Sequence, residues 1–490
     1  MIKKLLYSTL LTLISLIGLS QGALINRTFE NSTGKPLFNP ILSPFGIQWS
    51  NSIKDTSGSL ITVGYSSVPG NGQDVLLVKH NTAGVVTFST TYNSSGSNND
   101  YGIGLCEAPN GDFLVCGTTD NGGGNANYDI VVLRFNSSGT LLNSVIKNGR
   151  ANKNDVAVDV VVAPNGKIVV IANTEGANNL SDFWLVKFSS TLTYITSNTY
   201  DFVGLNDFAI GLKHTNGSKI KVIGASASGT NTADYVVAVF NANNLNFMSE
   251  TRNNLPGTAL DQALAYCEDA AESIYITGKA WNGTNFDIKT VKIDSSFSIV
   301  WTNTLNPHGM DDAANSIAVH PTSGDVVIGG YATRANNFKE IICAKLSSGT
   351  GSLIGGLHNQ SSENPSGDAF IKKIRIDATG SVFFVAGEKG ISGYKQVIVG
   401  KIKANNSLAW QRKISNPSHD ILPSDIISFS GSTSGVFAIS IKDSTTKSYL
   451  MTGYAELELD TAIVSYGDAK YKDKEIIVRF TKCIKLFGNK

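Results

Sequence analysis

The sequence predicts an all-β protein built as a β-propeller, a ring of four-stranded antiparallel sheets. A short apolar segment that begins at an acidic residue and ends at a basic one returns seven times, in steps of 52 to 56 residues. A second series of aspartates returns in steps of 51 to 56 residues. No long stretch shows the apolar period of a helix. A repeat of this length, made of short strands, is typical of radial β repetition.

The second series of aspartates marks where each unit begins. They are Asp100, Asp155, Asp207, Asp261, Asp312, Asp368 and Asp420. In the unit that opens at Asp100 we expect four strands, at 103–108, 113–118, 129–135 and 141–147. The turns between them contain Asn-Gly and Ser-Gly pairs, which tolerate positive φ.

The acid-to-base segment is expected to be the third strand of each unit. Its copies start at Asp74, Asp129, Asp182, Asp234, Asp287, Glu340 and Gln396. Val239 replaces the final cation in one copy, and Gln396 replaces the acid in the last. A residue needed once in every unit serves the fold rather than a single active site. We therefore interpret both series of aspartates as structural acceptors of turn N–H groups.

Two further positions are expected to serve packing. The second strand ends in a small residue, which suits a wedge-shaped sheet whose neighbours crowd it. These residues are Gly64, Gly117, Ala172, Gly224, Gly278, Gly330 and Gly387. An aromatic residue often follows nine positions after the third-strand cation, as at Phe88, Trp301 and Trp410. It is expected to fill the space between adjacent sheets.

The repeats give a propeller domain over residues 23–458, with units that begin near 45, 100, 155, 207, 261, 312, 368 and 420. The last unit shows three strands, and a fourth is expected at the other end of the chain, at 24–30. We favour eight blades closed by this N-terminal strand, since closure removes unpaired sheet edges. Seven blades, with residues 420–454 as an appendage, is the alternative.

With these residues in place, the repeat resembles the secreted bacterial β-propeller repeats of the SBBP type. The resemblance rests on the aspartate opener, the glycine-ended second strand and the D-x-x-x-x-K third strand, and it covers residues 45 to 454. It implies a propeller fold and leaves the function open, because propellers serve many roles. The family is named after a seven-bladed propeller, from which the eight-blade count departs.

The ends of the chain differ from the repeats. Residues 1–22 combine Lys3 and Lys4, a short apolar run and small residues, which predicts a secretory signal peptide and a secreted or cell-surface protein. No later segment is apolar enough to span a membrane. Residues 459–490 are rich in lysine and are interpreted either as a linker with a truncated module or as a basic tail.

Composition excludes some functions and limits the redox chemistry. The chain has 40 basic and 39 acidic residues, so no overall charge favours nucleic acid. Its five cysteines exclude a fully paired disulfide framework. Cys106 and Cys267 occupy equivalent positions and are interpreted as small buried residues. A disulfide between Cys106 and Cys116 stays open as an alternative.

No catalytic or cofactor motif stands out. The histidines lack the spacing of a zinc site, and no nucleophile elbow or phosphate loop is present. The loop 120–129 is rich in oxygen donors but lacks the pattern of a calcium loop, so calcium is only a weak alternative. Acids outside the repeat pattern are Glu107, Glu175, Glu250, Glu268, Asp269, Glu272 and Glu363. Nothing in the sequence brings two of them together for glycosidase chemistry.

We therefore expect a monomeric, non-enzymatic binding or scaffold module outside the cell, with an unknown protein or glycan bound on one propeller face. That face would be formed by the loops between second and third strands. Exposed aromatics there could stack on sugars, at Tyr65, Tyr128, Trp281 and Tyr331. The alternatives are a polysaccharide-active enzyme with carboxylates at the central channel, and a spacer for a lost C-terminal module.

Overall fold

A computed structural model describes most of the repeats and short strands at either end. The described residues are 27–29, 51–68, 72–81, 86–95, 99–120, 127–163, 165–215, 218–229, 232–253, 261–414, 421–428, 435–442, 448–455, 467–472 and 475–479. The predicted signal peptide lies outside them. Within them, no helix is long and apolar enough to cross a membrane.

Seven four-stranded antiparallel sheets follow one another along the chain, each with its strands in sequence order. Their strands are β2 (Asn51–Lys54), β3 (Leu60–Val68), β4 (Gly72–His80) and β5 (Val86–Tyr92); β6 (Asp100–Glu107), β7 (Phe113–Asp120), β8 (Tyr128–Phe135) and β9 (Leu141–Lys147); β10 (Asp155–Val162), β11 (Ile168–Glu175), β12 (Ser181–Phe188) and β13 (Tyr194–Tyr200); β14 (Asp207–His214), β15 (Lys219–Gly229), β16 (Thr232–Asn241) and β17 (Phe247–Asn253); β18 (Gln262–Glu268), β19 (Ile274–Trp281), β20 (Phe286–Ile293) and β21 (Ile299–Leu305); β22 (Ala313–Val319), β23 (Val326–Thr333), β24 (Lys339–Leu346) and β25 (His358–Ser361); β26 (Ala369–Ile376), β27 (Val382–Lys389), β28 (Lys395–Ile402) and β29 (Leu408–Ile414).

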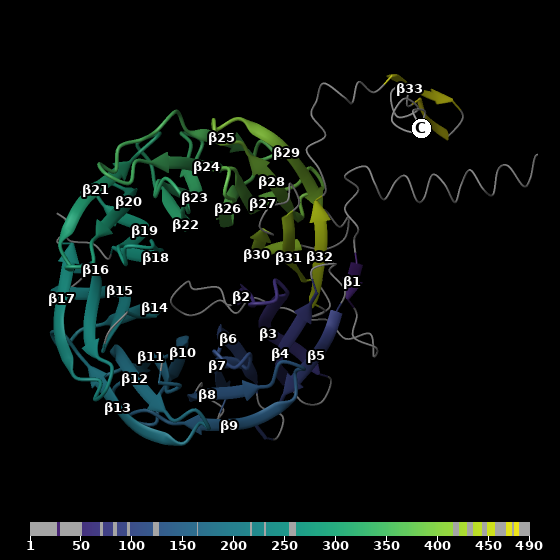
Figure 1. Cartoon of the computed structure of the whole chain (residues 1–490). Coiled ribbons are helices and arrows are strands. Elements are labelled where there is room, and N and C mark those ends of the chain that lie inside the picture. The colour runs from purple at the N-terminus through teal and green to yellow at the C-terminus, as the bar shows by residue number, and fades with distance from the viewer. Residues whose placement is uncertain are drawn as a thin grey trace, which may run out of the picture. The chain divides into compact units, whose positions relative to one another are not determined.

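These sheets are the blades of a propeller. The first strand of each blade lies toward the centre of the ring and the fourth at its rim (Figure 1). We call these the inner and outer strands. Successive inner strands pack against one another and against the preceding blade. The all-β propeller expected from the sequence is confirmed, and seven continuous blades are supported. The eight-blade expectation depends on one further sheet.

That further sheet combines both ends of the repeat region. Strands β30 (Ile421–Ser428), β31 (Gly435–Lys442) and β32 (Ser448–Ala455) are joined by β1 (Arg27–Phe29), in the order β1-β32-β31-β30. In this sheet Thr28 lies opposite Met451. Strand β30 packs against β26 and β27 on one side and against β2 on the other.

Each inner strand from β6 on carries a β-bulge, and the bulge explains the small residue at the end of the second strand. In blade β22–β25 the register shifts between Ala314 and Ser316, opposite Gly330. A Cβ on Gly330 would lie 2.0 Å from the backbone oxygen of Ala313. At Gly330 the crowding therefore comes from the blade's own inner strand, whereas the expected crowding by a neighbouring sheet is found at Gly387, where a Cβ would lie 3.2 Å from Pro423. In the last continuous blade Ala386 faces the bulge, and Gly387 lies one residue beyond it.

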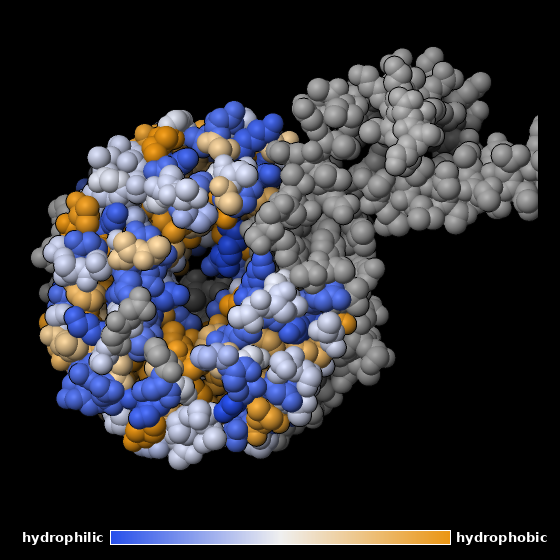
Figure 2. Space-filling view, viewed as in Figure 1, coloured by the Kyte–Doolittle hydropathy of each residue, from blue (hydrophilic) through white to orange (hydrophobic). Residues whose placement is uncertain are grey.

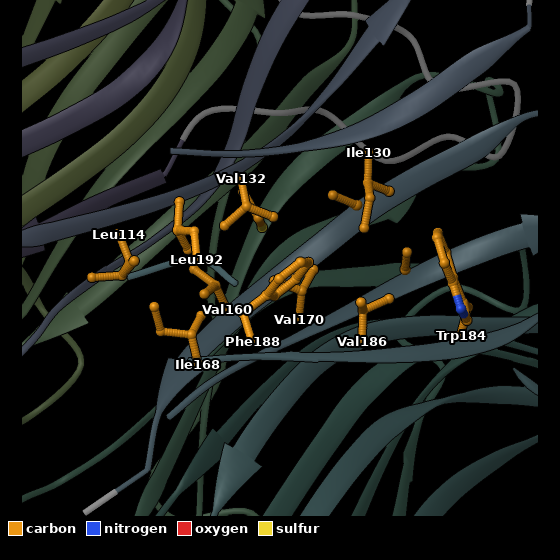
Figure 3. Packing of buried hydrophobic residues seen from close by; sticks show 13 residues of the cluster. Leu114, Ile130, Val132, Val160, Ile168, Val170, Trp184, Val186, Phe188 and Leu192 are labelled. Carbon is orange, nitrogen blue, oxygen red and sulfur yellow. The ribbon is translucent and has the colours of Figure 1, made fainter. Parts of the chain in front are cut away.

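The hydrophobic core is a series of layers between adjacent blades. One layer joins Leu114 and Val132 of blade β6–β9 to Val170 and Phe188 of blade β10–β13 (Figure 3). Equivalent clusters lie between the later blades. Since each blade buries its faces only against its neighbours, the ring is the unit that completes the core.

A second compact unit includes the described residues 467–472 and 475–479. In it, strands β33 (Gly467–Lys472) and β34 (Glu475–Arg479) form an antiparallel hairpin.

Candidate functional site: the central channel

The inner strands surround a cavity of about 890 Å³ at the centre of the ring. Strands β2, β6, β10, β14, β18, β22 and β26 all contribute to its wall. Figure 2 shows this centre hollowed, with hydrophilic and hydrophobic residues both at its rim. A mixed wall of this size is typical of a small-molecule site.

A non-repeating contact joins three blades at this wall. Asp159 on β10 accepts hydrogen bonds at Oδ2 from the Leu212 N–H and from the Tyr266 hydroxyl, both at 3.1 Å. The Tyr266 ring lies where a side chain on Gly211 would stand, since a Cβ there would come within 1.9 Å of the ring. Glycine at 211 thus lets a tyrosine of blade β18–β21 reach an aspartate two blades away.

The channel wall desolvates both groups of this contact. Burial raises the pKa of the Asp159 carboxyl and also that of the Tyr266 hydroxyl. The ammonium group of Lys213 lies 5.7 Å from the centre of the Tyr266 ring. Because a nucleophilic tyrosine needs a lowered pKa, this environment holds the Tyr266 hydroxyl as a hydrogen-bond donor.

Strand β26 adds a second group of cations to the wall. Lys373 and Arg375 both line the cavity. A guanidinium nitrogen of Arg375 lies 3.4 Å from the Asp425 carboxylate of β30. Burial, followed by repulsion from Arg375, lowers the pKa of Lys373. Two basic side chains therefore lie on this side of the channel, and one of them is paired with Asp425.

The other two carboxylates of the wall already have protein partners. Glu107 accepts hydrogen bonds from the backbone N–H and the hydroxyl of Thr56, at 2.8 and 2.9 Å. Glu268 forms an ion pair with Lys221, at 2.8 Å. Lys221 lies opposite Val239 in the sheet, so it supplies the cation that the third strand lacks.

The repeated opening aspartates lie at the start of the inner strands and accept N–H groups from nearby loops and strand ends. Asp155 accepts from Gly149 at 2.6 Å, and Asp312 from Thr333 at 2.8 Å. Asp100, Asp207, Asp261 and Asp368 likewise accept backbone N–H groups. Burial raises the pKa of Asp155, Asp207 and Asp261 to about 6 and that of Asp312 to about 7. Asp420 lies outside the described residues.

The residues that open the third strands are also buried: the acids Asp74, Asp129, Asp182, Asp234, Asp287 and Glu340, and Gln396 in the last copy. The cations at the other end of these strands face acids of the turn after the inner strand. Lys79 pairs with Asp55 at 2.7 Å, and Arg134 pairs with Asp112 at 2.5 Å. Lys187 instead donates to the backbone oxygens of Ala242 and Asn243 in the next blade. These contacts fasten turns and blades together.

One group of three carboxylates lies close enough for a cation, at Asp182, Asp201 and Asp207. Each already has a protein partner. Asp182 pairs with Arg150, Asp201 accepts the Gly204 N–H, and Asp207 accepts the Ser226 hydroxyl. We therefore assign no metal to this group. Most of the loop 120–129, the weak calcium alternative, lies outside the described residues.

Two expectations about side chains need correction. Tyr65, expected to be exposed, is buried with its ring edge-on to Tyr101. Cys106 and Cys116, the alternative disulfide pair, are both free, because the turn between their strands places Cys106 opposite Leu114 and Cys116 opposite Gly104. Tyr128, Trp281 and Tyr331 are partly buried. Trp281 packs on Phe286, and Lys339 lies over the Tyr331 ring.

Cys106 and Cys267 occupy equivalent places on β6 and β18, as the spacing predicted, but both line the cavity and are only half-buried. Burial raises the pKa of both thiols. Since the thiolate is the reactive form, this environment disfavours reactivity.

The remaining non-repeating acids have local partners outside the channel. Glu250 pairs with Arg252, and Glu175 accepts from Asn154. Asp269 closes its own turn by accepting the N–H groups of Ala271 and Ser273. Glu272 reaches Lys221 at 3.6 Å, and Glu363 reaches Lys413 at 3.3 Å. Sequence reasoning missed the Asp159 contact, because neither Asp159 nor Tyr266 was recognised as a repeated position; Gly211, whose place the Tyr266 ring fills, was the available signal.

Comparison with solved structures shows a likeness of fold. The chain matches the quinohemoprotein alcohol dehydrogenase ADHIIG from Pseudomonas putida HK5 with a TM-score of 0.50 and 10% identity, over 87% of this chain and 78% of that one. It matches the Dos1 propeller with a TM-score of 0.41 and 11% identity, over 74% and 79%. The β-propeller domain of the Trilobed protease from Pyrococcus furiosus matches with a TM-score of 0.39 and 10% identity, over 72% and 95%.

No protein-family model matches the sequence, and no curated protein matches it. At identities this low, a shared fold carries no activity from one protein to another.

Proposed function

We propose that this protein is a non-enzymatic β-propeller that binds a small ligand in its central channel. The observation that supports the proposal is the cavity of about 890 Å³, whose polar wall comes from residues that do not repeat. A purely structural channel would need no such asymmetry. The proposed binding place differs from the loop face expected from the sequence; three of those loops lie wholly or mostly outside the described residues.

The test is a ligand screen with a variant that fills the cavity. Ala318 lines the channel, and Ala318→Phe should abolish binding of any channel ligand. Val300→Phe on the outer strand β21, where Val300 is exposed, is the matched control. Purified protein would be screened by thermal shift against organic acids, nucleotides and oligosaccharides. Stabilisation that survives in Ala318→Phe would place the ligand elsewhere, and no stabilisation by any compound would refute the proposal.

A second candidate is a polysaccharide-active enzyme, favoured by the three carboxylates in the channel wall. Asp159 is the strongest of them, because its raised pKa suits a general acid. Its carboxylate, however, accepts from Val160, Leu212 and Tyr266, and these donors favour the ionised form. Released sugars from a polysaccharide panel, lost in Asp159→Asn, would support the enzyme and contradict the binding module.

We further propose that residues 1–22 direct export and that the mature protein is a monomer of the SBBP type. We also propose that the sheet β1-β32-β31-β30 is an eighth blade, which closes the ring. Pairing of Thr28 with Met451 supports the closure. Replacing residues 24–30 by a glycine-serine linker of equal length should then expose the edge of β32 to hydrogen exchange. Unchanged exchange in β32 would refute the closure. Mass spectrometry of protein recovered from the medium should show a new N-terminus near residue 23.

A further inference from the structure

We infer that the channel ligand is a small anion with at least two carboxylate or phosphate groups, bound between Lys213 on one side and Lys373 and Arg375 on the other. This inference rests on the proposed function, since it names the chemistry of the ligand at the same site.

Lys213 and Arg375 stand at the same level of the channel. In their sheets, Lys213 lies opposite Lys221 and Arg375 opposite Phe383, each two residues after the end of the bulge. Strand geometry gives residues at equivalent positions the same side-chain direction, and both residues line the cavity. Lys373 lies two residues before Arg375 on β26 and therefore faces the same side.

The blades between these cations place small side chains at this level. The equivalent residues of β18 and β22 are Cys267 and Ala318, which lie opposite Tyr275 and Val327. Both line the cavity. A long side chain at either position would occupy the space between Lys213 and Arg375. The short ones leave room for a ligand that reaches both.

Nearby carboxylates balance these cations only in part: Asp425 of β30 pairs with Arg375, and the charge of Asp159 interacts with Lys213. Asp159, Glu107 and Glu268 are engaged by Tyr266, Thr56 and Lys221. Among the described residues, neither Lys213 nor Lys373 has a carboxylate within the 4.0 Å of an ion pair. The pKa of Lys373 is lowered because its ammonium group is buried and is repelled by Arg375. A bound anion would relieve this repulsion and replace the lost hydration.

The volume of the cavity limits the size of the ligand. Ile210, Leu212 and Ile317 line the cavity beside the cations. Leu212 and Ile317 are buried in the cores between blades and offer a ligand little surface, so the volume suits a compact molecule whose charged groups reach the two sides. Two charged groups are needed because a single one would satisfy one side only.

The test is isothermal titration calorimetry with citrate, with inorganic pyrophosphate and with maltose, at constant ionic strength. We expect saturable binding of at least one of the two anions, and at least tenfold weaker binding to the double variant Lys213→Met, Arg375→Met. Methionine keeps the apolar stem and removes the charge. Lys345→Met is the matched control, because Lys345 faces Asp325 outside the channel. The citrate and pyrophosphate arms separate a carboxylate ligand from a phosphate ligand.

A measurement on the unaltered protein keeps the test independent of variant folding. Mass spectrometry after brief acetylation should show that the bound anion protects Lys213 and Lys373 but not Lys345. Absence of both anion binding and protection would overturn the inference, as would equal affinity in the double variant. If a neutral compound binds and is lost in Ala318→Phe, the proposed function stands and the anion inference fails. If no compound binds at all, both fail.

Discussion

The indole N–H of Trp301 donates a hydrogen bond to the backbone oxygen of Ser348, with 3.0 Å between nitrogen and oxygen. Trp301 is on the outer strand of one blade, and Ser348 is in a turn of the next. The same oxygen accepts a bond from Lys292 at 3.0 Å. The Trp301 ring also covers Gly351, where a Cβ would come within 2.4 Å of it. The Ser348 carbonyl and Gly351 therefore connect the outer parts of two adjacent blades through Trp301.

Trp301→Phe should destabilise the protein by about 1–2 kcal/mol, because the ring keeps much of its contact but the Ser348 oxygen loses one donor. Urea unfolding followed by fluorescence would measure the change. Trp281→Phe is the control, since the structure shows a ring contact with Phe286 for that side chain and no indole hydrogen bond among the described residues. Equal effects of the two substitutions would contradict a specific role for the Trp301 bond.

The bulge gives a prediction for the small residues of the second strands. Gly330→Ala should cost about 1–3 kcal/mol, because the new methyl group meets the Ala313 oxygen and the inner strand must shift. Gly349→Ala is the matched control, since a Cβ there meets no atom within 4 Å. The free energy of unfolding in urea would compare them. If Gly330→Ala leaves the free energy of unfolding unchanged, the inner strand shifts without a measurable cost.

Much of this fold could be predicted because it repeats. Period-two strands, turn glycines and the spacing of the aspartates are local signals, and seven copies average out the exceptions. The direction of crowding at Gly330 could not be predicted, because a bulge shows itself only when two strands are paired. The alternative of a Cys106–Cys116 disulfide is not found, since Cys106 lies opposite Leu114.

The candidate site could not be predicted, because its residues do not repeat from blade to blade. Asp159 and Tyr266 meet across two blades, and their contact depends on the missing side chain of Gly211. No sequence spacing encodes a contact between residues 107 positions apart. Equivalence of Lys213 and Arg375 likewise becomes visible only once each bulge has been placed in its strand.

The buried opening aspartates predict a pH dependence of stability. Burial, together with repulsion from Asp287, raises the pKa of Asp312 to about 7 from an ordinary value of 3.8. The neutral form is therefore favoured in the folded state. Its contribution to stability is complete below about pH 4 and is lost as the pH rises through about 7.

Asp312→Asn should remove this part of the pH dependence. Asparagine stays neutral and keeps an oxygen that can accept the Thr333 N–H. We expect the variant to gain stability relative to the unaltered protein between pH 5 and pH 8, as measured by thermal unfolding. Asp294→Asn is the control, because hydrogen bonds from Ser296 and Ser298 lower the pKa of that exposed carboxyl. If the difference in stability between Asp312→Asn and the unaltered protein stays constant from pH 5 to pH 8, Asp312 is not neutral in the folded protein.

Gln396 stands where the other third strands have an acid, and this difference leads to a prediction. The Gln396 amide nitrogen donates to Glu388 and to Glu363, both at 2.7 Å. Lys413 lies 2.9 Å from Glu388 and 3.3 Å from Glu363. Glu388 stands opposite Gln396 on the second strand. The acid missing from the third strand is therefore present on its neighbour, and the glutamine supplies the neutral donor between two carboxylates.

Restoring the repeat pattern with Gln396→Glu should therefore destabilise the protein, by about 3 kcal/mol, because a third carboxylate would be buried beside two others with only Lys413 to balance them. Urea unfolding at pH 8 would measure the loss, which should shrink at pH 5 as a carboxyl takes up a proton. The double variant Glu388→Gln, Gln396→Glu exchanges the two groups and should recover most of the stability. A stabilising Gln396→Glu would mean that the repeat pattern, and not the local charge balance, governs this position.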